Sequence, residues 1–96
     1  MPQLVKTSTT PGTPVALVAT DTYCQQAVIF GYKALARTAN TGDVYLGLSA
    51  TASQQPLVLK SEESYLLGGQ MKRLNLAELY LDVANSGDGV VVMYYI

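Results

Sequence analysis

The chain has 96 residues, of which 49% are hydrophobic and 14% are charged, and its formal net charge is −1. This length favours one domain, and the charged fraction is well below the roughly 25% of an average soluble protein. Lys72 and Arg73 are the only adjacent cationic pair. Because nucleic-acid binding requires clustered cations, we expect no nucleic-acid partner.

The low charge and high apolar content have two possible explanations. Interfaces between subunits are depleted of charge, so we favour a surface reserved for a partner subunit. The alternative is a monomer whose surface is covered by Ser, Thr, Asn and Gln. The N-terminal residues lack the apolar core of a signal peptide, and no apolar run is long enough to span a bilayer. We therefore expect synthesis in a cytoplasm and no membrane partner.

Residues 1–14 are rich in threonine and contain Pro2, Pro11 and Pro14. They predict an extended N-terminal arm or an edge strand, followed by a β domain over residues 15–96. As an arm, residues 2–13 would be removable without loss of the monomer fold. Val15–Val18 is a short predicted strand, and the apolar run within residues 24–37 predicts a central strand.

Two similar turns organise the rest of the chain. The turn-forming residues are Asn40, Gly42 and Asp43 in the first turn, and Asn85, Gly87, Asp88 and Gly89 in the second. Asn and Asp are expected to bond their own backbone there, and glycine to supply positive φ. The first turn precedes a strand in which Val44, Leu46 and Leu48 share one face; the second precedes the last strand, Val90–Tyr95.

Residues 57–84 complete the predicted strands. Leu57–Leu59 and Ser64–Leu67 are separated by a short polar turn, which favours a hairpin. Gly68 and Gly69 then lead into residues 70–73, residues 75–78 form a single turn, and Leu79, Leu81 and Val83 alternate with polar residues as in a strand. The last strand is so apolar that it must be paired inside a sheet.

The elements together predict an all-β fold, a compact antiparallel β-sandwich or jelly-roll-like domain of about seven or eight short strands. An immunoglobulin-like topology would produce a similar pattern. Tyr94 and Tyr95 are adjacent in the last strand, so they point to opposite faces and one is available for contact. Leu4, Val5, Tyr94 and Tyr95 are our candidate interface residues.

The sequence offers little catalytic chemistry. It has no histidine, which excludes histidine-dependent triads and imidazole-based metal sites. Cys24 heads an apolar run and is expected to be buried. Glu62 and Glu63 are typical of a solvated turn, and the spacing of Asp82, Asn85 and Asp88 does not match a calcium loop. We predict no catalytic residue, no metal and no cofactor.

Residues 24–95 resemble a group of small phage virion proteins. The resemblance is carried by the ordered succession of Ala27–Ile29, Asn40–Gly47, Leu59–Tyr65, Asn75–Asp82 and Asn85–Val90. It implies a jelly-roll sandwich and a role as a capsid decoration, or cement, protein that forms homotrimers. The implied partners are further copies of the chain and the major capsid protein of a phage, and the implied location is the virion, after synthesis in the bacterial host cytoplasm.

Two other functions remain open from the residues alone. Tyrosines with Asn- and Asp-rich loops could bind sugars, as in a carbohydrate-binding or adhesion module, although the chain has no tryptophan. An enzyme would have to depend on Glu62, Glu63, Asp82 or Asp88. Of the three functions, the non-enzymatic virion protein is the one we expect.

Overall fold

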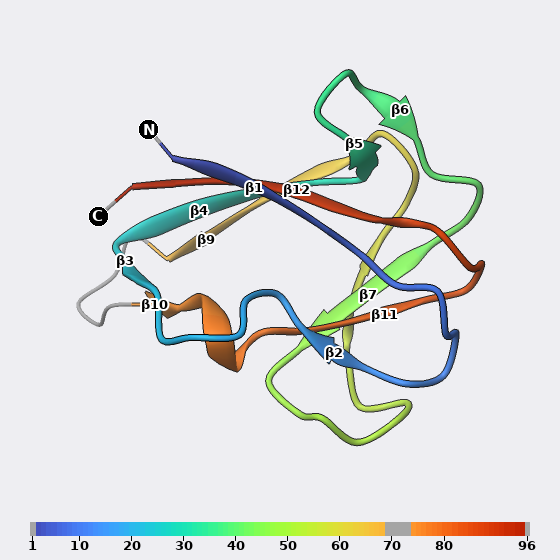
Figure 1. Ribbon diagram of the computed structural model, residues 1–96, viewed down its shortest axis with the longest axis horizontal. Helices are drawn as coiled ribbons and strands as arrows, with labels where there is room; N and C mark the ends of the chain where they lie inside the picture. Colours follow the sequence, from blue (N-terminus) through green and yellow to red (C-terminus); the bar gives the residue numbers. More distant parts are fainter. Residues whose placement is uncertain (1, 69–73, 96) are drawn as a thin grey trace.

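The computed structural model describes residues 2–68 and 74–95 as two antiparallel four-stranded sheets packed face to face (Figure 1). The first sheet contains, in spatial order, β1 (Gln3–Thr7), β12 (Gly89–Tyr95), β4 (Gln26–Phe30) and β9 (Ser64–Gly68). The second contains β2 (Val15–Ala16), β11 (Tyr80–Val83), β7 (Val44–Gly47) and β8 (Leu57–Leu59). The predicted all-β sandwich is confirmed.

Smaller elements complete the fold. Two short pairs stand beside the sheets: β5 (Tyr32–Ala34) with β6 (Thr38–Ala39), and β3 (Tyr23–Cys24) with β10 (Leu74–Asn75). A 3₁₀ helix, η1 (Leu76–Glu78), follows β10, and the Asn75 side chain caps it by accepting a hydrogen bond from the backbone N–H of Ala77. This is the single turn predicted for residues 75–78.

The order of the strands distinguishes a jelly roll from an immunoglobulin-like sandwich. Among the eight strands of the two large sheets, the first pairs with the last, the second with the seventh, the third with the sixth and the fourth with the fifth. This nesting of antiparallel pairs is the jelly-roll arrangement. The C-terminal strand β12 therefore lies between β1 and β4, inside the first sheet, as its composition predicted.

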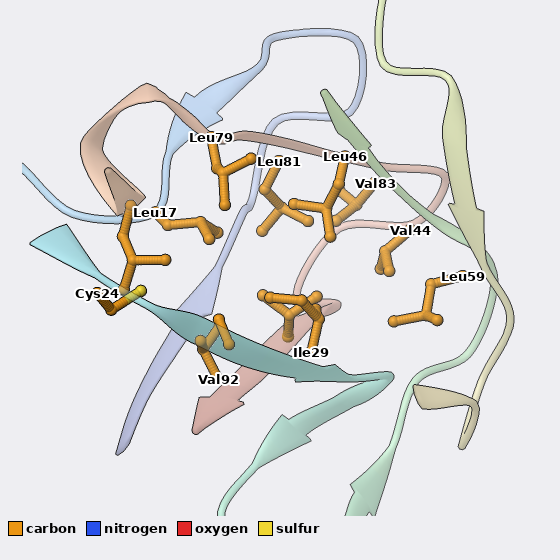
Figure 2. Close-up of a cluster of buried hydrophobic side chains, with 13 residues drawn as sticks. Leu17, Cys24, Ile29, Val44, Leu46, Leu59, Leu79, Leu81, Val83 and Val92 are labelled. Atoms are coloured by element: carbon orange, nitrogen blue, oxygen red, sulfur yellow. The ribbon is translucent and has the colours of Figure 1, made fainter. Parts of the chain in front are cut away.

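The core lies between the sheets and takes side chains from both (Figure 2). Ile29 and Val92 of the first sheet point toward Val44, Leu46 and Leu81 of the second. All five are at most 2% exposed, and alternate residues of each strand supply them, because successive side chains of a strand point to opposite faces. Cys24 is fully buried at the edge of this cluster.

The hairpin predicted for Leu57–Leu59 and Ser64–Leu67 is wrong. β8 pairs with β7 in the second sheet, whereas β9 pairs with β4 in the first. The turn between them is held at the end of β4, where the Gly31 N–H donates to the Glu63 carbonyl at 2.7 Å and the Glu62 N–H donates to the Gly31 carbonyl at 3.0 Å. These hydrogen bonds fix the turn in which the chain passes from the second sheet to the first.

Of the two alternatives predicted for the N-terminal segment, the structure has the edge strand: β1 pairs with β12 along its whole length, and Leu4 packs against the core. Two further expectations are wrong. Leu48 lies beyond the end of β7 and is 72% exposed, so it does not share the buried face of Val44 and Leu46. The strand expected through Arg37 ends at Ala34 and turns. The predicted connection at residues 69–73 lies outside the described residues.

Candidate interaction surface

The two predicted turns meet at one end of the sandwich, around the buried carboxylate of Asp88. This carboxylate accepts hydrogen bonds from the Thr41 N–H at 3.0 Å, the Gly42 N–H at 2.9 Å and the Thr41 hydroxyl at 3.0 Å. Asp88 is 0% exposed, and the Lys33 ammonium lies 3.9 Å from it. The buried charge is therefore stabilised by donors of the other turn, 46 and 47 residues away in the chain.

Asn40 joins the same two turns through the backbone. Its side-chain amide donates to the Gly89 carbonyl at 2.8 Å and its side-chain oxygen accepts from the Gly89 N–H at 3.0 Å. The expectation that Asn40 and Asp88 bond their own turns is therefore wrong, because each bonds the opposite turn. Gly87 has the expected positive φ of 91°, whereas Gly42 does not. Instead, a Cβ at Gly42 would collide with the Asn85 side chain.

The remaining turn-forming residues lie at the same end. The Asp43 carbonyl accepts from the Ala84 N–H at 3.1 Å, and the Asn85 carbonyl accepts from the Asp88 N–H at 3.3 Å. Asp43 is half-buried and Asn85 is exposed. The side chains of Asn40 and Asp88 thus form a structural lock between the two turns.

The acidic residues weighed for catalysis or metal binding do not converge. Asp82 accepts hydrogen bonds from the backbone N–H groups of Gly12 and Val83, at 2.9 and 2.8 Å. Glu62 and Glu63 are exposed, and Glu63 accepts from the Lys60 N–H at 2.8 Å. Among residues 2–68 and 74–95, no three His, Cys, Asp or Glu side chains form a group that could hold a metal ion.

The four candidate interface residues divide into two pairs. Leu4 and Tyr94 are half-buried and pack against the core. Val5 and Tyr95 point the other way, and they are 38% and 45% exposed. The outward pair lies on the outer face of the first sheet. That face is therefore the candidate interaction surface.

Over the strand positions that the structure describes, the outer face of the first sheet is mainly apolar and carries no charged side chain. The strand register places Val5, Val91, Met93, Tyr95, Val28, Phe30 and Leu66 on it, together with the polar but uncharged Gln3, Thr7, Gln26 and Ser64. We call this surface the apolar face. The outward side of a two-sheet sandwich is normally polar, so this apolar face is a candidate contact surface.

The β5–β6 pair overhangs one end of the apolar face (Figure 1). It covers Val91, which is 7% exposed yet does not belong to the core cluster. Between the overhang and the sheet is a hollow of about 350 Å³, floored by Phe30, Val91 and Met93. Leu35, 57% exposed, lies at its rim.

Two charged residues of opposite sign also line this hollow. Arg37 and Glu62 are exposed, and both have left-handed backbone conformations, with φ of 63° and 71°. Such conformations are uncommon for residues other than glycine, and they cluster at binding sites. The hollow thus combines an apolar floor with one cation and one anion at its edge.

A second hollow lies between the edges of the two sheets. It has a volume of about 590 Å³ and is lined mainly by leucines of several elements: Leu46, Leu48, Leu57, Leu67, Leu74 and Leu79. Among residues 2–68 and 74–95, its polar lining consists of Ser49 and Gln54. A lining of this kind suits apolar matter.

The apolar face was not singled out from the sequence, but a signal for it existed. Ala27–Phe30 and Val90–Tyr95 are continuous apolar runs, whereas a strand with one solvated face alternates apolar and polar residues. These runs predict central strands covered on both sides. In the monomer, the core covers the inner side, whereas the outer side is half-buried at Val28, Phe30 and Met93 and exposed at Tyr95.

Comparisons with protein-family models, with curated proteins and with solved structures find no match for this chain. No helix in the described part of the chain is long and apolar enough to cross a membrane.

Proposed function

We propose that this protein is a non-enzymatic structural component of a phage virion, a decoration protein that self-associates and binds the assembled capsid shell. The observation that carries the proposal is the apolar face, an apolar surface without charged strand positions on a small jelly roll. Jelly rolls recur in viral coat proteins, but they also occur in lectins and enzymes. The fold therefore supports the proposal only together with this surface.

The mechanism would be selective binding to one state of the shell. Copies that bind the assembled lattice, but not its separated subunits, stabilise the lattice by mass action. Many linked weak contacts can hold a decoration layer even when each contact is small. On this proposal the partners are other copies of the chain and the major capsid protein, and the protein is located on the virion.

Quantitative mass spectrometry of particles from the natural source of the chain tests this role. Particles purified on a density gradient should contain peptides of this chain in a fixed ratio to the major shell protein. A high-salt wash serves as the control for loosely adsorbed protein, because adventitious charge-mediated binding is screened by salt. Particles that lack the chain, or lose it entirely in that wash, would contradict the virion role.

The hollow beneath β5–β6 favours one alternative, a carbohydrate-binding or adhesion module. Tyr32 and Phe30 supply aromatic surface, and Gln3, Arg37 and Glu62 supply polar groups at its edge. Sugars bind where apolar surface and a few oriented polar groups converge. A glycan array probed with the purified protein should give specific binders that are lost in Arg37→Ala; an array without binders removes this alternative.

A further inference from the structure

We propose that the apolar face packs against the same face of a second copy of this chain. This inference rests on the self-association part of the proposed function and assigns a surface to it. The side chains of the apolar face point outward from four neighbouring strands. They therefore form one continuous patch rather than scattered apolar residues. Val5, Tyr95 and Leu66 are 38%, 45% and 57% exposed in the monomer.

The distribution of charge favours a second copy of the chain as the partner that covers the apolar face. A contact between identical faces brings each residue near its own counterpart, so any charge near the symmetry axis meets a like charge. The strand positions of the apolar face carry no charge, and this source of repulsion is absent. Arg37 and Glu62, which line the hollow, have opposite signs, so Arg37 of one copy can approach Glu62 of the other.

The shape of the face is also compatible with its own copy. Leu35 stands exposed at the rim of the hollow, and the floor of that hollow is apolar. The face therefore carries both a projecting leucine and a depression that accepts apolar side chains. Two such faces can exchange these features across a twofold axis, as isologous interfaces do.

The size of the face predicts a weak association. Four strands paired over five residues each cover about 20 by 17 Å, or roughly 340 Å² before the β5–β6 pair is added. Standard stable interfaces bury about 800 Å² on each partner. We therefore expect pairs that dissociate on dilution and that become effective where many copies are held together on one surface.

The test is the concentration dependence of molar mass, measured by light scattering and sedimentation equilibrium on the full chain. The parent protein should approach the mass of two chains as concentration rises. Leu66→Glu, which places like charges in the contact, should raise the dissociation constant at least about tenfold. Leu35→Glu, at the hollow, should act in the same direction.

Val58→Glu is the matched control. Val58 is 48% exposed on the edge strand β8 and points outward from the opposite sheet, where it pairs with Tyr45. The same charge is thus introduced at a similar position off the apolar face, and association should be unchanged. Thermal denaturation of each variant separates loss of association from loss of folding.

The outcomes separate this contact from the virion role. A parent protein that stays monomeric at all concentrations, or one in which Leu66→Glu and Val58→Glu act equally, overturns the contact. A stable mass of three chains, unaffected by Leu66→Glu, also overturns it but upholds self-association as the resemblance implies. If pairing depends on Leu66 while purified particles lack the chain, the contact stands and the virion role fails.

Discussion

Asp88 illustrates how one residue determines the geometry of a whole end of the sandwich. A fully buried carboxylate is costly unless donors surround it, and here the donors are two backbone N–H groups and one hydroxyl from the opposite turn. Replacing it leaves those donors without an acceptor. Because buried donors without an acceptor are costly, we expect even a conservative substitution of Asp88 to lower the stability markedly.

Asp88→Asn should lower the free energy of unfolding by about 2–3 kcal/mol, because the amide retains one acceptor oxygen and places its NH₂ group against the Thr41 or Gly42 donors. Urea denaturation followed by circular dichroism measures this change. Asp21→Asn is the control: Asp21 is exposed and accepts from the Asn75 side chain at 3.1 Å, and should change stability by less than about 1 kcal/mol. Equal effects of the two substitutions would show that the Asp88 network contributes no special stability.

The sequence marked Asn40 and Asp88 as turn residues but could not indicate that they bond each other's turns. Local chemistry explains why Asn and Asp occur in turns, whereas their partners here are 46 to 49 residues away. Such pairing depends on which strands the fold brings together. The residue types were therefore predictable, and the lock that they form was not.

At the scale of elements, the strand positions were largely predictable and one pairing was not. Val44, Leu46, Leu81 and Val83 alternate as expected and are buried. A short polar turn between two strands normally forms a hairpin, but the turn after Leu59 is bonded to Gly31. A long-range backbone contact overrode the local preference, and this crossing is one of the connections between the sheets in the jelly roll.

Deletion of the strand β12 and deletion of the strand β1, both in the first sheet, should have unequal effects. Removing residues 90–96 takes away the strand between β1 and β4 and exposes Ile29, so we expect insoluble protein. Removing residues 2–7 takes away an edge strand and should leave soluble protein with a lower melting temperature. The soluble fraction after expression and thermal denaturation measure both effects. A soluble, cooperatively folded 90–96 deletion would refute the central role of β12.

At the scale of the molecule, the two sheets share one core. Side chains of both sheets form a single buried cluster, and the Asn40–Asp88 region joins the second sheet to the first through the turn between β11 and β12. Neither sheet has a separate core cluster of buried side chains among the described residues. A sheet separated from the other would expose its buried face, so the sheets should not unfold independently.

We therefore expect a single cooperative unfolding transition in which tyrosine fluorescence and circular dichroism coincide. Leu46→Ala, at a side chain 2% exposed in this core, should shift both probes together and cost about 3 kcal/mol, because it removes buried apolar surface and leaves a cavity. Leu48→Ala is the control, since Leu48 is 72% exposed and should cost less than about 1 kcal/mol. If tyrosine fluorescence and circular dichroism instead report separate unfolding transitions in Leu46→Ala, the sheets are distinct folding units. In that case the shared core would not account for the stability of the sandwich.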